Sequence, residues 1–335
     1  MTTLTQHTDP DPTAEPDAGA HAGKRRIPSF AYKLMLLAAA LIWGLSFVVM
    51  KDAVDVLEPA TLIGVRFFVC GLILAVVFQK RLRAHLDRRY VLGGLACGAL
   101  IFIAYWLQTI GLANTTPGKN AFITATYVVI VPFAWWLAAR RRPTAANVVA
   151  AVLCVVGIGL VSVTGNLTVG FGDLMTLVSA VFFAAHIVYV AIASKDRDVF
   201  VLTVYQFLFG GVLGLLIGGL TEPAPDLSLV TPAFLFNMAY LVLFASLLAL
   251  LFQNVAIAKV PPAQGALLLS LESVFGVLSS VLLYGEAMTL RLVVGFALIF
   301  VAIVVSETFP LKEAPWHRKS NAPKQASSTE ATSSS

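Results

Sequence analysis

Charged residues are scarce in this chain. Only 12% of its 335 residues are Asp, Glu, Lys or Arg, whereas 58% are hydrophobic, and the mean hydropathy is +0.85. Soluble domains carry about 25% charged residues and cannot cover this much apolar surface within one core. The composition therefore excludes an ordinary soluble domain and favours a protein of the lipid bilayer.

Cysteine is also rare. The three cysteines, Cys70, Cys97 and Cys154, lie inside apolar runs and lack the spacing of metal ligands. They form neither an even disulfide set nor a zinc framework, so we interpret them as small apolar packing residues. We expect no metal site and no cofactor.

Long apolar runs, by contrast, fill most of the chain. A membrane helix needs about 20 residues to cross a hydrocarbon core of about 30 Å. In lipid such a run must be helical, because its backbone N–H and C=O groups need internal partners. Ten segments of this kind are expected: Ala31–Met50, Pro59–Phe78, Val91–Gly111, Lys119–Ala139, Asn147–Val163, Asp173–Ser194, Val199–Leu220, Pro232–Ala258, Ala263–Tyr284 and Leu290–Phe309.

Basic residues are distributed unevenly between the loops. If the N-terminus is cytoplasmic, nineteen Lys and Arg residues fall on the cytoplasmic side, and only Lys51, Lys119 and Arg291 fall outside. This asymmetry predicts that both termini are cytoplasmic. It also explains the sequence pI of about 9.2 without a nucleic-acid partner.

Two parts of the chain resemble each other. Residues Tyr105–Pro132 return 145 positions later, and the earlier segments match with an offset of 140. The matched pairs include Gln108 with Gln253, Tyr127 with Glu272, Ser46 with His186, and Arg66 with Gln206. Polar residues that appear twice at matching places predict a site built from both halves.

The repeat also predicts the fold class, an all-α polytopic membrane protein. Each half holds five segments, and this odd number makes the halves enter the membrane in opposite senses. We therefore expect ten transmembrane helices arranged as two inverted five-helix repeats, residues 31–163 and 172–309, with a site near the midplane where they meet. Residues 1–30 and 310–335 are expected to be disordered cytoplasmic tails, because their composition cannot bury enough surface.

Glu272 is the sharpest candidate for chemistry. It lies deep in the ninth segment among apolar neighbours. A charged group at mid-span costs roughly 2.5–3.5 kcal/mol on insertion scales and normally faces a cavity or a partner. Burial favours the neutral form of a carboxyl, as a proton-coupling site requires. The alternative is a neutral glutamate that is hydrogen-bonded between helices.

Arg66 and His186 are further polar residues within the apolar segments. Arg66 either attracts an anion in the cavity, pairs with a carboxylate or extends towards the outer surface. His186 is either a proton relay, a substrate contact or a hydrogen-bonded packing residue. The same choice between substrate contact and structural role applies to the remaining candidates, which are Trp43, Ser46, Tyr105, Gln108, Thr124, Tyr127, Phe183, Gln253 and Asn254.

Several motifs carry a resemblance to a known family. The first half contains Trp43–Phe47 (WGLSF), Arg66-Phe67, Leu107–Leu112 (LQTIGL) and Tyr127–Pro132 (YVVIVP); the second contains Gly172-Asp173, Leu271–Phe275 (LESVF) and Tyr284–Glu286 (YGE). Over about residues 31–309 the chain resembles the EamA family of the drug/metabolite transporter superfamily. One departure is Ser273, where family members often carry Pro; it predicts a straighter ninth helix around Glu272.

The resemblance implies a ten-helix bundle in a bacterial-type inner (plasma) membrane. Such proteins move small metabolites and often export amino acids or related compounds through a cavity between the two halves. We predict a secondary transporter, an exporter in which Glu272 is the candidate for proton coupling, with a small solute and the bilayer as partners. The alternatives are a passive facilitator or channel, and a membrane-embedded enzyme, which is disfavoured because His186 has no His or Asp nearby in the sequence. Monomer and homodimer both stay open.

Overall fold

The computed structural model describes residues 29–140, 142–162, 169–260 and 262–308. The predicted tails lie outside these ranges, except that Ser29 and Phe30 open the first helix. The described residues are helical and contain no β-strand. The elements are α1 (Ser29–Ala53), α2 (Pro59–Val77), α3 (Gln79–Ala84), α4 (Arg88–Ala113), α5 (Pro117–Ala125), α6 (Tyr127–Ala139), α7 (Ala145–Ser162), α8 (Phe171–Ala193), α9 (Val199–Thr221), η1 (Leu227–Leu229), α10 (Pro232–Tyr240), η2 (Leu241–Leu248), α11 (Ala249–Ile257), α12 (Pro262–Ser279), η3 (Ser280–Tyr284) and α13 (Leu290–Thr308).

Among these residues, eight helical stretches are long and apolar enough to cross a membrane. They overlap the first eight predicted segments. The last two predicted segments overlap shorter apolar helices, Leu268–Tyr284 and Leu290–Ser306. The prediction of a polytopic, all-helical membrane protein is therefore confirmed.

Two predicted segments differ in their internal structure. The fourth is interrupted at Thr126, between α5 and α6, where the Thr126 hydroxyl donates to the carbonyl of Ile123 at 2.6 Å. A threonine that bonds back to its own helix bends it, and Pro132, six residues later, removes a further backbone donor. The eighth segment contains the π-helix η2, in which backbone hydrogen bonds join residues five positions apart, whereas an α-helix joins residues four positions apart.

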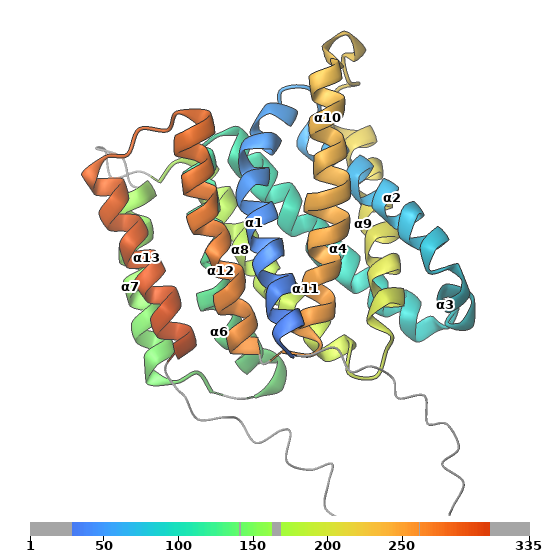
Figure 1. Ribbon diagram of the computed structural model, residues 1–335, viewed down its shortest axis with the longest axis horizontal. Coiled ribbons are helices and arrows are strands. Elements are labelled where there is room, and N and C mark those ends of the chain that lie inside the picture. Colours follow the sequence, from blue (N-terminus) through green and yellow to red (C-terminus); the bar gives the residue numbers. More distant parts are fainter. Residues whose placement is uncertain (1–28, 141, 163–168, 261, 309–335) are drawn as a thin grey trace, which may run out of the picture.

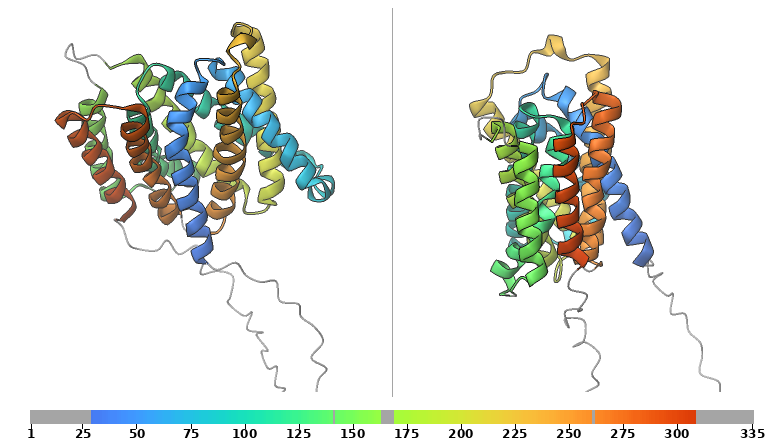
Figure 2. Two further views of the ribbon diagram at one scale, coloured as in Figure 1. Left: turned by 45° about the horizontal axis from the view of Figure 1, so that its top comes forward. Right: turned by 90° about the vertical axis from the view of Figure 1, so that its left-hand side faces the viewer.

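The helices stand side by side as a bundle of rods (Figure 1). The beginning of α1 and the end of α13 lie at the same end of the bundle, the proximal end, whereas α1 finishes at the opposite, distal end (Figures 1 and 2). The main contacts join the two predicted halves: α2 packs on α9, α7 on α13, α4 on α8 and α9, and α1 on α11 and α12.

Glycine allows the closest of these contacts. A Cβ atom at Gly64 of α2 would lie 2.6 Å from the backbone nitrogen of Leu215 and 2.7 Å from the carbonyl carbon of Gly214, both in α9. Real Cβ atoms do not approach backbone this closely. Small residues therefore set the distance between α2 and α9, as is common for helices packed within membranes.

Candidate functional site

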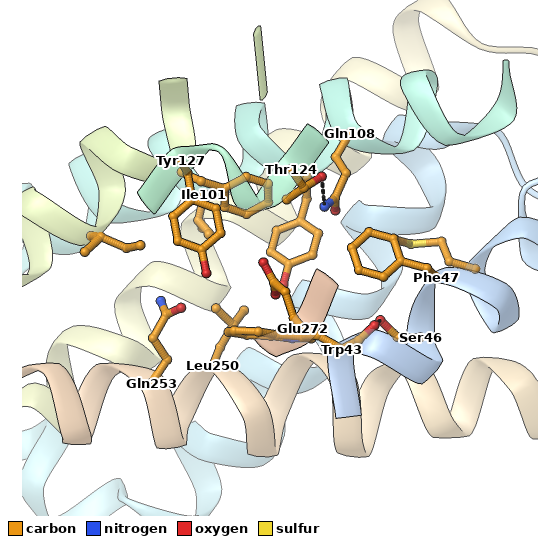
Figure 3. A pocket seen from close by; sticks show the side chains of 14 residues that line it. Trp43, Ser46, Phe47, Ile101, Gln108, Thr124, Tyr127, Leu250, Gln253 and Glu272 are labelled. Atoms are coloured by element: carbon orange, nitrogen blue, oxygen red, sulfur yellow. Dashed lines mark hydrogen bonds between the residues drawn. The ribbon is translucent and has the colours of Figure 1, made fainter. Parts of the chain in front are cut away.

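A small cavity lies between the two predicted halves, enclosed by α1, α4, α5, α6, α8, α11 and α12 (Figure 3). Its lining comprises Trp43, Ser46, Phe47, Met50, Ile101, Tyr105, Gln108, Thr124, Tyr127, Phe183, Ile187, Leu250, Gln253 and Glu272. The wall is mainly apolar and aromatic, with a few polar groups. This combination is typical of sites for small molecules.

Aromatic rings from both halves form one side of the cavity. The Phe183 ring of α8 lies 5.1 Å from the Tyr105 ring in an edge-on arrangement and 6.1 Å from the Tyr127 ring. Trp43 of α1 is fixed by its indole N–H, which donates to the carbonyl oxygen of Ala245 in η2 at 2.7 Å. These contacts hold the aromatic wall rigidly across the junction of the halves.

The amide groups of the lining differ in how they are held. The Gln108 Nε2 donates to Thr124 Oγ1 at 3.0 Å, which links α4 to α5 (Figure 3). Ser46 donates to the Trp43 carbonyl of its own helix at 2.8 Å. Gln253 of α11 extends into the cavity from the other half in the same view. Hydrogen-bonding groups thus face the cavity from both halves.

Glu272 supplies the carboxylate of this lining. It is 4% exposed, and its carboxyl group points into the cavity from α12 (Figure 3). The Tyr127 hydroxyl is within electrostatic reach of this carboxyl group. Neither of the two ion pairs within the described residues involves Glu272. The helix runs unbroken through Ser273, whose hydroxyl donates to the Ser270 carbonyl at 2.7 Å. A carboxyl buried in an apolar wall without a cationic partner is a candidate contact for a cation or a proton.

Nine of the twelve predicted site residues line this cavity, whereas Arg66, His186 and Asn254 do not. Arg66 is fully buried behind the wall, where its Nε and Nη2 donate to Ser246 Oγ at 3.1 and 2.9 Å. The predicted carboxylate partner is absent from the ion pairs of the described residues.

His186 and Asn254 belong to a second buried cluster between α8, α9 and α11. Gln206 Oε1 lies 3.0 Å from His186 Nε2 and accepts from Asn254 Nδ2 at 3.3 Å, and Asn254 also donates to Thr203 Oγ1 at 3.0 Å. Of the alternatives for these two residues, the arrangement agrees with the structural role, because His186 Nε2 and Asn254 Nδ2 find partners on α9 and not in the cavity.

Five lining residues were not predicted: Phe47, Met50, Ile101, Ile187 and Leu250. All are apolar, so polarity could not single them out. Each lies three or four positions from a predicted residue on the same helix, as Phe47 and Met50 do from Trp43 and Ser46. Helical spacing would have found them.

Two carboxylates at the distal end hold the turn between α4 and α5. Asp173 of α8 accepts from Thr115 Oγ1 at 2.6 Å and from Lys119 Nζ at 2.8 Å. Glu286, between η3 and α13, accepts from the Gly118 backbone N–H at 3.0 Å and from the Thr116 and Ser280 hydroxyls. We call Asp173, Glu286 and the turn Thr115–Lys119 the distal clamp.

In the described part of the chain, no group of three or more His, Cys, Asp or Glu side chains is arranged to hold a metal ion. The cavity chemistry therefore rests on one carboxylate, two amides, hydroxyl groups and aromatic rings.

Comparisons with known proteins identify a family, two relatives and a similar fold. The model of the EamA-like transporter family matches residues 31–163 and again residues 170–308. A protein of Archaeoglobus fulgidus named as an uncharacterized transporter is 30% identical over 272 residues, which cover 81% of this chain and 84% of that protein. The uncharacterized transporter YvbV of Bacillus subtilis is 24% identical over 85% of this chain and 94% of its own length. A solved crystal structure with 17% sequence identity superimposes with a TM-score of 0.62 over 83% of this chain and 96% of that one.

Proposed function

The chain belongs to the EamA-like transporter family, and from this premise we propose that it is a secondary transporter that moves small organic metabolites by alternating access. The observation that carries the proposal is the buried Glu272 carboxyl in the wall of a cavity that both halves enclose. The cavity is narrow in this conformation, and its lining of aromatic rings, amides, hydroxyls and one carboxyl suits a small organic solute such as an amino acid or a related compound.

An inverted repeat is the architecture that we propose for this cavity. If the halves are related by a two-fold axis, α1, α4 and α5–α6 correspond to α8, α10–α11 and α12. The observed contacts then come in matching pairs, since α4 on α8 mirrors α1 on α11, and α1 on α12 mirrors α6 on α8. The elements α2 and α9, which correspond to each other, pack together, as do α7 and α13. This pairing supports ten membrane crossings in two oppositely oriented halves of residues 31–163 and 172–309.

The orientation that we propose places the proximal end in the cytoplasm of a bacterial-type cell. The excess of basic residues in the loops of that end supports it. The three distal cations have structural roles: Lys51 Nζ donates to the carbonyl of Leu112 at 2.7 Å, Lys119 pairs with Asp173, and Arg291 lies 3.5 Å from the Gly159 carbonyl.

Export is the direction that we propose. The distal clamp holds together the helices on the outer side of the cavity, so a cytoplasmic solute would enter this conformation first. A clamp made of an ion pair and hydrogen bonds also favours a gated carrier over an open channel, because these contacts must break before solute leaves at that end.

Proton coupling through Glu272 is the mechanism that we propose for driving transport. A neutral Glu272 is compatible with the mainly apolar wall of the cavity, and loss of its proton would create a charge that attracts a cationic group of the solute. Binding of a proton and of a cationic group then exclude each other, which couples their movements.

Proteoliposomes with an imposed pH gradient test this function. We expect that Glu272→Gln abolishes the dependence of solute flux on the gradient, because glutamine cannot exchange a proton. The control is Glu58→Gln, the same change at an exposed residue before α2. Gradient-dependent flux that persists in Glu272→Gln would refute proton coupling at this residue.

A further inference from the structure

Arg66 is a cation placed directly behind the cavity wall. It belongs to α2, is 0% exposed and is among the largest fully buried side chains. None of the ion pairs of the described residues includes it, so no carboxylate compensates its charge there. An uncompensated charge inside a membrane protein is costly and rarely persists without a function.

The hydrogen bonds of Arg66 leave part of its guanidinium unused. Of five N–H groups, three donate in the described structure: two to the hydroxyl of Ser246 and one, from Nη1, to the thioether sulfur of Met50 at 2.8 Å. A thioether is a weak acceptor. The guanidinium also lies 5.7 Å from the centre of the Tyr105 ring. All of these partners are neutral, and the strongest natural partner of a guanidinium, a carboxylate bound by two N–H groups, is missing.

Only one layer of side chains separates this cation from the cavity. Met50 and Tyr105, which contact the guanidinium, both line the cavity themselves. The Met50 side chain is unbranched and adapts its shape easily, so it can move aside at little cost. Tyr105 is also within electrostatic reach of Glu272, so the same side chain is close to both ionisable residues.

We propose that Arg66 is the anion-binding group of this transporter: a solute carboxylate takes the place of the Met50 thioether and pairs with the guanidinium. The substrate class is then small organic solutes that carry a carboxylate, with any cationic group directed to Glu272. This inference rests on the proposed function in that the solute must enter this cavity.

The corresponding position of the second half shows that the charge is specific to one side. Gln206 matches Arg66 in the repeat and bonds with His186 and Asn254, so this site is filled by neutral groups. With an arginine behind one side and a glutamine behind the other, the two sides of the cavity differ in electrostatic potential. A solute with two different ends would therefore bind in one orientation.

A first experiment measures the field of Arg66 in the cavity without any solute. Met50→Cys is reacted with an anionic and a cationic methanethiosulfonate reagent in purified protein, and both rates are divided by those of a free thiol. We expect the anionic reagent to be favoured about tenfold, because a unit charge several ångströms away in a poorly solvated site changes rates on that scale. The native cysteines are buried, and protein without the new cysteine measures their background.

Two variants assign this preference to the guanidinium. Arg66→Gln, which copies the residue of the other half, should abolish the preference, and Arg66→Lys should retain it. Arg81→Gln is the control, since Arg81 lies in α3, pairs with Asp198 at 3.0 Å and does not line the cavity. An unchanged ratio in Arg66→Gln would overturn the inference. If Arg66→Gln does not fold, the test rests on Met50→Cys alone. If this variant shows no preference for the anionic reagent, the inference is overturned as well.

A second experiment measures recognition with pairs of solutes that differ only in the carboxylate. The pairs are 3-phenylpropionate with 3-phenylpropanamide, and L-leucine with L-leucinamide. We expect the carboxylates to raise the Tm of the wild-type protein and to compete for transport more strongly than the amides. Arg66→Gln should weaken carboxylate binding about tenfold to a hundredfold, the range for a lost charge-assisted hydrogen bond. Met50→Leu, which removes only the thioether, should keep the preference.

The two possible failures are distinguishable. Equal binding of carboxylates and amides, or a preference that survives in Arg66→Gln, overturns the role of Arg66 while transport itself stands. Absence of saturable flux for every solute, neutral ones included, refutes the proposed function and the substrate class with it. The reagent ratio is read on purified protein and does not depend on flux.

Discussion

Removal of the Glu286 charge should open the distal side of the cavity. Glu286 accepts hydrogen bonds from the Thr116 hydroxyl, from the Gly118 backbone N–H and from the Ser280 hydroxyl. It therefore joins the last part of the chain to the first turn of α5, which forms part of the cavity wall through Thr124. In Glu286→Gln one oxygen and the negative charge are lost, and at most one carbonyl acceptor remains.

The size of the effect follows from these contacts. A hydrogen bond to a charged group contributes about 1.5–3 kcal/mol, and a negative charge at a helix N-terminus adds about 0.3–1 kcal/mol. Glu286 is partly exposed, so water replaces some of this interaction. We take about 2 kcal/mol as the net loss, which raises the population of the distally open state about thirtyfold if that state is rare in the wild type.

The assay uses Ser46→Cys as a reporter inside the cavity. Ser46 lines the cavity and bonds only within its own helix, so the change to cysteine is mild. A membrane-impermeant thiol reagent is added from the distal side, and its reaction rate with the cysteine is measured with and without Glu286→Gln. We expect an increase on the order of thirtyfold, because the rate follows the population of the open state.

Asp198→Asn is the matched control for this experiment. Like Glu286, Asp198 accepts a hydrogen bond from a backbone N–H at the start of a helix, that of Phe200 at 2.8 Å; it also pairs with Arg81, and it lies at the proximal end. Its loss should leave the distal rate unchanged. Equal rates in wild type and Glu286→Gln, with the fold intact, would refute the clamp, and so would an equal increase in the control.

Two further predictions concern packing and topology. Gly64→Ala should lower the thermal unfolding midpoint in detergent, because overpacking against the α9 backbone costs about 1–3 kcal/mol. Gly219→Ala is the control, since its new Cβ would meet no atom within 4 Å and should leave the midpoint unchanged. Equal midpoints in the two variants would contradict the role of Gly64. Cysteines introduced by Arg83→Cys and Pro225→Cys should react from opposite sides of the membrane, and labelling from the same side would disprove the proposed orientation.

The positions of the helices could be predicted from the sequence because apolar runs of this length have one stable structure in lipid. Their internal irregularities could not. Leu241–Leu248 is almost uniformly apolar, and nothing in these residues favours a π-helix over an α-helix. The contacts of η2 are tertiary: its Ala245 carbonyl accepts from Trp43, and its Ser246 hydroxyl accepts from Arg66. Contacts with α1 and α2 therefore accompany the local geometry, and a sequence taken segment by segment contains no sign of them.

The duplication indicated several residues of the candidate site. Gln108 and Gln253 both line the cavity, and so do Tyr127 and Glu272, which is the result expected if the proposed two-fold axis relates the halves. The contacts between helices could not be predicted, because the sequence does not indicate that the helices of each half pack mainly on helices of the other half. The distal clamp was missed because Asp173 and Glu286 are loop-side charges, and such residues are usually solvated and unremarkable in a sequence.

Arg66, His186 and Asn254 show why polarity alone does not define a lining. A polar side chain inside an apolar segment must be satisfied, but the cavity is only one of the places where it can be. His186 and Asn254 find neutral partners in α9 and become part of the packing. Arg66 bonds to neutral groups too, but hydrogen bonds to neutral groups do not neutralise a charge. The free-energy cost of burying its charge is therefore only partly offset. That difference separates a structural polar residue from one that awaits a ligand, and it is visible only when charge and hydrogen bonds are counted separately.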